Sequence, residues 1–331
     1  MSLMNSWCEK MFLRRCVAVA AVSSLLVLAA CGGDSGTSAP INNESESSSS
    51  TDLLNSSSSS SEESSSGVEE VSSSSQDGSS CSSSAALNCS VLLEGETGWS
   101  WDVPKECRFN PNITYGTMTD SRDNKVYKTV KIGNQVWMAE NLNYADSVKT
   151  PSLKGKNWCY ANKAENCAVT GRLYTWAAAI DSVKLATDAD NPQNCGYVKT
   201  CTLPAKVQGI CPDGWHLPTK TEWETLVTAV GGWSTAGKIL KYQTGWISNG
   251  NDTDGVGFSA LPAGRMDGNG YSCYDGDYAG FWSATEYDGG FAYGLELLYY
   301  SDGGVPSSDE IAQLAGDNYK GYGFSVRCLK D

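Results

Sequence analysis

The sequence predicts an exported α+β domain that is crosslinked by disulfide bonds and preceded by a long polar segment. Three observations support this prediction. Helix-like patterns occur in the middle of the chain and strand-like patterns dominate its last third, which is typical of the α+β class. Thirteen cysteines occur among 331 residues, as expected for a protein that folds in an oxidising compartment. A serine-dominated stretch without aromatic residues lies ahead of the domain.

Residues 1–30 have the features of a bacterial export signal. Arg14 and Arg15 precede an apolar run that is shorter than a membrane-spanning helix. The run ends in Leu28-Ala29-Ala30-Cys31, which resembles the lipobox of bacterial lipoproteins. The resemblance implies that Cys31 is lipidated and that several acyl chains attach the protein to a membrane. Because glycine and not aspartate follows this cysteine, the resemblance favours the outer membrane, with the domain exposed on the cell surface.

Residues 31–84 form a predicted tether. The segment is rich in serine and contains nine carboxylates but no lysine or arginine. It cannot bury enough apolar surface to offset the entropy of ordering, so we expect it to be disordered. A flexible chain of about 50 residues has a root-mean-square reach of about 40 Å. The tether carries more than half of the formal net charge of −14. The rest of the chain is mildly acidic and has no basic patch with interleaved aromatic residues, which disfavours nucleic-acid binding.

Ten cysteines remain after the signal and Cys31 are set aside, and this even number predicts disulfide bonds. Zinc is the competing interpretation, but the chain has no Cys-x-x-Cys motif and His216 is its single histidine. Short loops and the positions of the elements suggest the pairing. The predicted pairs are Cys159–Cys167, Cys195–Cys201, Cys211–Cys328 and Cys89–Cys107, which leaves Cys81 for Cys273.

The globular part divides into a small preface, residues 85–116, and a main domain, residues 117–331. In the main domain, alternating residues at 126–132 and 135–138 flank a Gly-Asn turn and predict a β-hairpin. Residues 172–180 are interpreted as a short helix. No segment after the export signal is apolar and long enough to span a membrane.

The clearest helix begins at Thr219. Thr219 and Glu222 have the spacing of a capping box, in which each side chain bonds to the other's backbone amide. One apolar stripe follows and Gly231-Gly232 ends the helix. Ser234 is expected to cap a second short helix that runs to Leu240. Four later strands are predicted, at residues 256–261, 280–284, 293–299 and 322–329, and we expect them to form a C-terminal antiparallel sheet.

Four stretches resemble the Fibrobacter succinogenes major paralogous domain. They are Tyr127 to Gly133 with Trp137 to Leu142, Cys211 to Thr219 with Glu222-Trp223, Phe281 to Glu286, and Gly323 to Cys328. The resemblance runs from about Thr117 to Asp331. It implies a surface lipoprotein of a family whose biochemical role is not established.

A more distant similarity suggests a finer fold and bears on catalysis. The motif around His216 and the terminal Gly-Phe-x-x-Arg-Cys are similar to the formylglycine-generating, sulfatase-modifying enzymes, which implies a C-type-lectin-like fold. Those enzymes use two cysteines five residues apart, whereas here Gly323 stands five residues before Cys328. A disulfide to Cys211 would also remove the thiolate. His216 is interpreted as a structural hydrogen-bonding residue, and no Ser/His/Asp set can be assembled without it. We therefore expect no catalytic residues, although the carboxylate pairs of an acidic domain are also compatible with a glycosidase.

The predicted ligand site lies on the loops next to the C-terminal strands, where lectin-like folds display theirs. Aromatic rings stack on sugar faces, and Asn and Asp side chains bond to sugar hydroxyls. The structural alternative is that the aromatic residues belong to the core and the Asn and Asp residues form turns. The candidates are Trp246, Asn251, Asp252, Asp254, Asp267, Asn269, Tyr271 and Tyr274.

The predicted ligand loops also contain two candidate calcium ligands. Asp252 and Asp254 suggest part of a calcium loop, but the first ligand and the closing glutamate of an EF-hand are missing from the sequence. We expect no other cofactor.

Two functions fit these observations. One is a carbohydrate-binding module, with plant-type polysaccharide as the leading ligand class. The other is a protein-interaction module, such as an adhesin or a structural part of the envelope. An enzyme related to the formylglycine-generating fold fits less well. The sequence does not separate the first two functions, and in either case we expect a lipid-anchored monomer.

Overall fold

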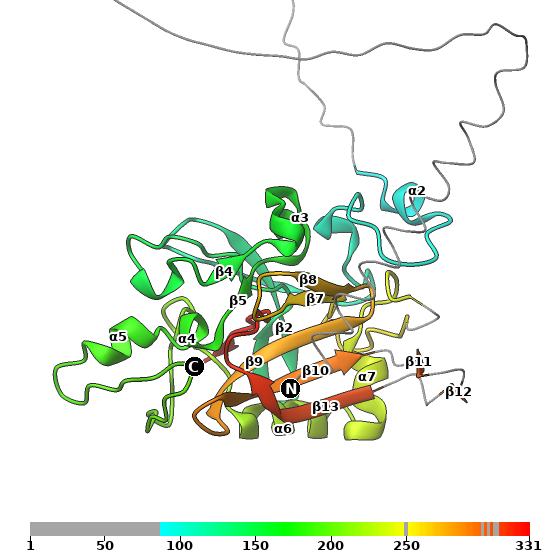
Figure 1. Cartoon of the computed structure of the whole chain (residues 1–331). Helices are drawn as coiled ribbons and strands as arrows, with labels where there is room; N and C mark the ends of the chain where they lie inside the picture. The colour runs from blue at the N-terminus through cyan, green and yellow to red at the C-terminus, as the bar shows by residue number, and fades with distance from the viewer. Residues whose placement is uncertain (1–86, 248–250, 299–300, 303–304, 307–310) are drawn as a thin grey trace, which may run out of the picture. The chain divides into compact units, whose positions relative to one another are not determined.

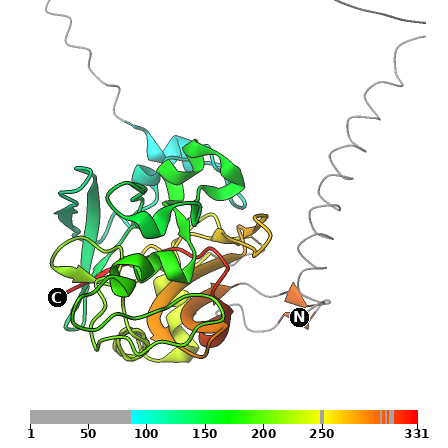
Figure 2. The same ribbon diagram turned by 60° about the vertical axis from the view of Figure 1, so that its left-hand side comes forward.

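Two five-stranded sheets and several short helices make up the part of the chain that the structure describes (Figures 1 and 2). The structure is a computed structural model, and it describes residues 87–247, 251–298, 301–302, 305–306 and 311–331. The predicted export signal, Cys31 and the tether lie outside these residues. No helix in the described ranges could cross a membrane. The predicted α+β class is confirmed.

The first sheet brings the end of the chain beside the start of the main domain. Its strands follow the order β1-β2-β3-β14-β6, and all neighbours are antiparallel. The strands are β1 (Gly116–Thr119), β2 (Val126–Ile132), β3 (Gln135–Met138), β14 (Leu329–Lys330) and β6 (Trp215–His216). The predicted hairpin is confirmed as β2 and β3. In β14, Leu329 lies between Trp137 and His216, and Figure 2 shows this red segment ending beside the hairpin.

The second sheet has the order β13-β10-β9-β7-β8. Its strands are β7 (Ala263–Met266), β8 (Ser272–Asp275), β9 (Tyr278–Glu286), β10 (Phe291–Leu298) and β13 (Ile311–Tyr319). The strands predicted at 280–284 and 293–299 are confirmed as parts of β9 and β10. The sheet is antiparallel as predicted, except that β7 and β9 pair in parallel at Gly264 and Ala279.

Two further pairs of short strands are β4 (Asn157–Trp158) with β5 (Leu173–Tyr174) and β11 (Ser301–Asp302) with β12 (Val305–Pro306). The short helices lie mostly in the first half of the domain. They are α2 (Cys89–Leu93), η1 (Lys105–Cys107), η2 (Pro151–Leu153), η3 (Tyr160–Asn162), α3 (Ala164–Thr170), α4 (Trp176–Ala179) and α5 (Ser182–Ala186).

Helices α6 (Lys220–Ala229) and α7 (Trp233–Leu240) cover one face of the second sheet (Figure 1). The capping box at the start of α6 is confirmed, because the Thr219 and Glu222 side chains each bond to the other's backbone amide. The cap predicted for α7 is wrong. Gly232 is the N-cap and Ser234 lies inside the helix, because the left-handed backbone at Gly232 already turns the chain into the helix.

Three other predicted elements differ from the structure. The helix predicted at 172–180 is shorter, because residues 173–174 pair with β4 and Thr175 caps α4 through its hydroxyl. The strand predicted at 256–261 is absent. Gly257 and Ser259 have φ of +71° and +51° there, a left-handed backbone that strands do not adopt. The terminal segment from residue 322 makes isolated bridges before β14.

Two hydrophobic clusters lie on opposite faces of the second sheet. Residues that alternate along β9 separate them: Phe281 packs with α6 and α7, whereas Trp282 faces the other way. On that other face, Phe324 of the terminal segment stacks on Trp282 with ring centroids 4.5 Å apart. Trp137 and Trp223 stack in the helix-covered cluster at 4.6 Å, so large rings dominate both parts of the core.

All four disulfide bonds predicted between described cysteines are confirmed. They are Cys89–Cys107, Cys159–Cys167, Cys195–Cys201 and Cys211–Cys328. Cys273 is also disulfide-bonded, and its predicted partner Cys81 lies outside the described residues. The long bond from Cys211 to Cys328 fastens the terminal segment to the segment that precedes β6.

Candidate functional site

Tyrosines from separate parts of the chain gather at one region, which we call the tyrosine surface (Tyr197, Tyr271, Tyr274, Tyr319 and Tyr322). The Tyr197 and Tyr319 rings meet with centroids 4.6 Å apart, and Tyr319 meets Tyr322 at 5.4 Å. Tyr271 is 57% exposed and Tyr197 is 44% exposed. Tyr197, Tyr319 and Tyr322 therefore support one another, while the Tyr197 and Tyr271 rings keep broad contact with solvent.

A buried lysine holds the loop that carries Tyr197. The Lys320 Nζ donates hydrogen bonds to the carbonyl oxygens of Gly196 (3.3 Å) and Lys199 (3.0 Å), and it also pairs with Glu286. The Cys195–Cys201 disulfide closes the same loop. Because Lys320 directly follows Tyr319, this one side chain places the Tyr197 loop against the Tyr319 ring.

The turn between β7 and β8 also lies next to Tyr319. Asp267 Oδ1 accepts hydrogen bonds from the backbone amides of Asn269 (2.8 Å) and Tyr271 (2.9 Å), which tightens the turn. A side chain at Gly268 would begin 3.3 Å from the Tyr319 ring, so the turn rests on that ring. Asn269 and Tyr271 are exposed on the turn and supply polar groups next to the aromatic rings.

Arg265 lies below this surface between two of its rings. The guanidinium carbon is 4.4 Å from the Tyr322 ring centroid and 5.1 Å from that of Tyr274. The side chain is 7% exposed, and its Nε has no hydrogen-bond partner among the described residues. The cation therefore stabilises both rings through cation–π contacts and adds positive charge beneath the surface.

The structure divides the predicted ligand residues into two groups. Asp267, Asn269, Tyr271 and Tyr274 belong to the tyrosine surface or its adjoining turn. The other four, Trp246, Asn251, Asp252 and Asp254, belong to the segment that follows α7. The sequence analysis missed Tyr197, Tyr319 and Tyr322. A tyrosine next to glycine in a polar segment could have indicated Tyr197 and Tyr322, whereas Tyr319 lies two residues from the nearest glycine.

In the second group, the prediction that Trp246 offers a ring to a ligand is wrong. The ring is fully buried and its Nε1 donates to the Ala260 carbonyl. Asn251 is used structurally, since its Oδ1 accepts from the Trp246 amide at 2.8 Å. Tertiary packing has therefore made Trp246 a core residue, which was the structural alternative.

The two calcium candidates have different partners. Asp254 is fully buried, and its two carboxylate oxygens accept from the Ser259 amide and hydroxyl, each at 2.7 Å. Burial raises its pKa to about 6, which opposes the charge that calcium binding needs. Asp252 instead lies 3.7 Å from Lys241 Nζ. Within the described ranges, no cluster of three or more His, Cys, Asp or Glu side chains could hold a metal.

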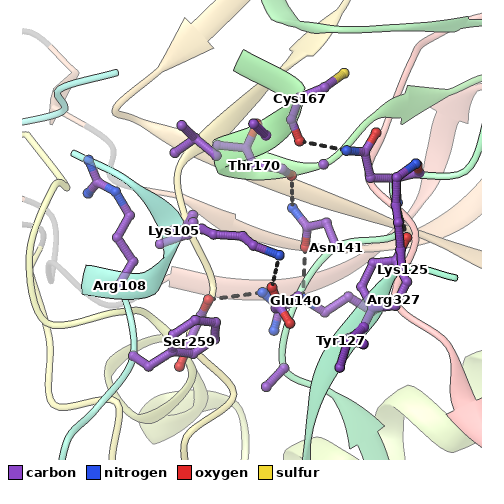
Figure 3. Close-up of a pocket in the computed structure, with 18 residues that line it drawn as sticks. Lys105, Arg108, Lys125, Tyr127, Glu140, Asn141, Cys167, Thr170, Ser259 and Arg327 are labelled. Atoms are coloured by element: carbon purple, nitrogen blue, oxygen red, sulfur yellow. Dashed lines mark hydrogen bonds and ion pairs between the residues drawn. The ribbon is translucent and has the colours of Figure 1, made fainter. Parts of the chain in front are cut away.

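A separate polar cavity of about 130 Å³ lies between the preface, β2, the end of α3 and the terminal segment. Figure 3 shows Asn141 at its centre. The Asn141 Nδ2 donates to the Thr170 carbonyl at 2.8 Å, and its Oδ1 accepts from Arg327 Nε at 2.8 Å. Lys105 reaches Glu140 at 2.8 Å across the same space. Residues of two motifs that carry the family resemblance, 137–142 and 323–328, thus meet at this cavity.

His216 lies buried between two carboxylates. It belongs neither to the tyrosine surface nor to the cavity lining. Its Nδ1 is 2.6 Å from Asp331 Oδ1 and its Nε2 is 2.9 Å from Glu222 Oε1. Burial alone would lower the His216 pKa, but the hydrogen bonds to Glu222 and Asp331 raise it above its ordinary value. Burial would likewise raise the Glu222 pKa, and the bonds from His216 and Thr219 lower it.

This arrangement predicts a pH-dependent stability. The raised His216 pKa stabilises the fold fully below about pH 6.5, and this contribution is lost as pH rises through the pKa of the folded state. The lowered Glu222 pKa contributes above about pH 4.5 and is lost as pH falls. We expect His216→Gln to remove the decline in unfolding free energy on the alkaline side, measured by urea unfolding at several pH values. Because His216 is the single histidine, equal slopes above pH 6.5 in both proteins would contradict the prediction.

Comparison with known proteins identifies the family. The model of the Fibrobacter succinogenes major domain matches residues 130–330, and the chain therefore belongs to this family. The matched region lies within the predicted main domain and includes the whole tyrosine surface and most of the cavity lining. Comparisons with curated proteins and with solved structures found no match.

Proposed function

We propose that this member of the Fibrobacter succinogenes major domain family is a non-catalytic binding module on a bacterial cell surface, and that it binds polysaccharide through the tyrosine surface. The observation that carries the proposal is the meeting of Tyr197, Tyr319 and the Tyr271 turn. Tyrosine offers a large amphipathic ring at low cost in conformational entropy. Rings already held by their neighbours lose little further freedom when a ligand binds.

The polar groups next to these rings suit a sugar. Asn269 is exposed beside Tyr271, and its amide can bond to sugar hydroxyls while a ring packs against the apolar sugar face. Plant-type polysaccharide is the ligand class that we infer by analogy with the family's namesake organism. The lipobox at Cys31 and the tether would hold this surface away from the outer membrane, and we expect a monomer.

Two features support a non-catalytic role. Cys328 is bonded to Cys211, so it offers no thiolate for the chemistry of the formylglycine-generating enzymes. Both His216 ring nitrogens are engaged by carboxylates in a buried position. The C-type-lectin-like assignment is part of the same proposal, and the pairing of the terminal strand β14 with β3 supports it.

The test is retention of the mature, disulfide-bonded protein on insoluble cellulose and xylan. We expect Tyr197→Ala and Tyr271→Ala each to weaken retention by about tenfold, as for an aromatic residue at the centre of an interface. Both changes are at exposed positions, so the melting temperature should stay the same within a few degrees.

Trp233→Ala is the matched control, because Trp233 is 41% exposed and lies on α7, which covers the opposite face of the sheet. This variant should bind as the unchanged protein does. Equal retention of all three variants would remove the site from the tyrosine surface. Absence of retention on every polysaccharide, together with capture of a defined envelope protein that Tyr197→Ala abolishes, would favour the protein-interaction function instead.

A further inference from the structure

The polar cavity of Figure 3 contains an excess of positive charge that the binding of sugar at the tyrosine surface does not use. Lys105, Arg108, Lys125 and Arg327 line it, and Glu140 is the one carboxylate in the lining. Lys125 also forms an ion pair with Asp123 at 2.9 Å, so the excess comes mainly from Lys105 and the two arginines. This excess occurs in a chain whose formal net charge is −14. A partly enclosed space with charges of one sign strengthens their interaction with a counter-ion.

The two arginines are buried without a carboxylate partner. Arg108 is 2% exposed and Arg327 is 1% exposed. Arg108 donates to the Val103 and Ser100 carbonyls, and Arg327 donates to Asn141 and to the Phe258 and Ser259 carbonyls. Among the described residues, neither forms an ion pair with Asp or Glu. Burial lowers the pKa of Arg108 to about 10 and that of Arg327 to about 9, which is the expected sign of incomplete charge compensation.

We propose that this cavity is a second ligand site, which binds a small organic carboxylate. Lys105 Nζ is the group that would contact it. This amine uses one hydrogen bond within the described ranges, to Glu140, and its side chain is 36% exposed, so it can bond to an incoming carboxylate as well. The cavity volume of about 130 Å³ exceeds the roughly 10–15 Å³ that one water needs.

The donors that remain in the cavity favour a carboxylate over phosphate. Glu140 is already beside Lys105, and the Cys167 and Thr170 carbonyls lie at the end of α3 on the cavity wall. A carboxylate has two oxygens to satisfy where phosphate has four, so it suits a cavity whose arginines already donate to protein oxygens. The site is therefore expected to prefer acetate or the carboxylate of a sugar acid, and to ignore the neutral sugar.

The experiment is a calorimetric titration of the full disulfide-bonded protein at constant ionic strength, with acetate, glucuronate, glucose and inorganic phosphate as probes. We expect saturable binding of glucuronate and acetate and none of glucose. Lys105→Gln should weaken binding by about tenfold, the loss of one charge-assisted hydrogen bond. Lys131→Gln is the matched control, since Lys131 is an exposed lysine on β2 outside the cavity.

A second pair of variants tests the cavity without changing its cations. Ala168 is an exposed lining residue of α3. Ala168→Glu would place a carboxylate there and should abolish binding, whereas Ala168→Gln, of the same size, should retain it. Equal affinity of Lys105→Gln and Lys131→Gln, or preference for phosphate or glucose, would overturn the proposal. Tyr197→Ala should leave carboxylate binding unchanged, so this result and the polysaccharide result can fail independently.

Discussion

Replacement of Arg327 by methionine is expected to lower the free energy of unfolding by about 3–5 kcal/mol. Arg327 is buried, and its guanidinium satisfies three oxygens from separate segments: Asn141 Oδ1 and the Phe258 and Ser259 carbonyls. Methionine fills most of the space but donates no hydrogen bond, so these acceptors would remain buried and unpaired. Urea unfolding with intact disulfides measures the loss, and the urea midpoint should fall without a large change in slope.

Two further variants separate hydrogen bonding from charge. Arg327→Lys keeps the positive charge but offers one compact ammonium group in place of the planar fork, so we expect it to be less damaging than methionine and still clearly destabilising. Lys131→Met removes a positive charge from an exposed site on β2 and should change stability by less than about 0.5 kcal/mol. An unchanged midpoint for Arg327→Met would show that the three oxygens find other partners.

The second large effect is expected from removal of the Cys211–Cys328 disulfide. The bond joins residues 117 positions apart, and the chain-entropy model predicts that its loss lowers the free energy of unfolding by about 4–5 kcal/mol. Both cysteines are fully buried in the hydrophobic cluster beneath the terminal segment. We therefore expect the double variant Cys211→Ala, Cys328→Ala to lose the most stability of any disulfide variant between described cysteines, measured by urea unfolding.

The matched control is the double variant Cys195→Ala, Cys201→Ala. This bond closes a separation of six residues, for which the same model predicts a loss of about 2 kcal/mol. Both of these cysteines are only partly buried, so little packing is lost as well. The same loss in both double variants would contradict loop length as the main cause. The short-loop variant should also weaken polysaccharide retention, because the loop carries Tyr197.

Local chemistry determined several features of this protein. The β2–β3 hairpin follows from alternation around a Gly-Asn turn, and the start of α6 follows from the spacing of Thr219 and Glu222. The disulfides Cys159–Cys167 and Cys195–Cys201 follow from short loops. In each case the interacting groups are close in sequence, so their geometry depends little on the rest of the chain.

Long-range packing decided the rest. The sequence of residues 256–261 favours a strand, but Ser259 has a left-handed backbone. In this conformation its carbonyl accepts a hydrogen bond from Arg327 and its hydroxyl donates one to Asp254. The sequence around Trp246 is typical of a loop, yet the ring is fully buried in the core. Burial of so large a ring stabilises the fold more than its exposure would. Strands β7, β8 and β13 lack a local pattern that identifies them, since their positions depend on partners in the second sheet.

The sequence by itself thus determined the class of the fold, its main disulfides and its family. Only the tertiary structure decided which residues form a surface. Tyr197 and Tyr319 meet because Lys320 binds the loop of one while it adjoins the other, and Lys105 of the preface meets Glu140 at the cavity. Contacts of this kind join residues that are far apart in sequence and depend on how separate elements pack together. A local sequence pattern does not contain that information.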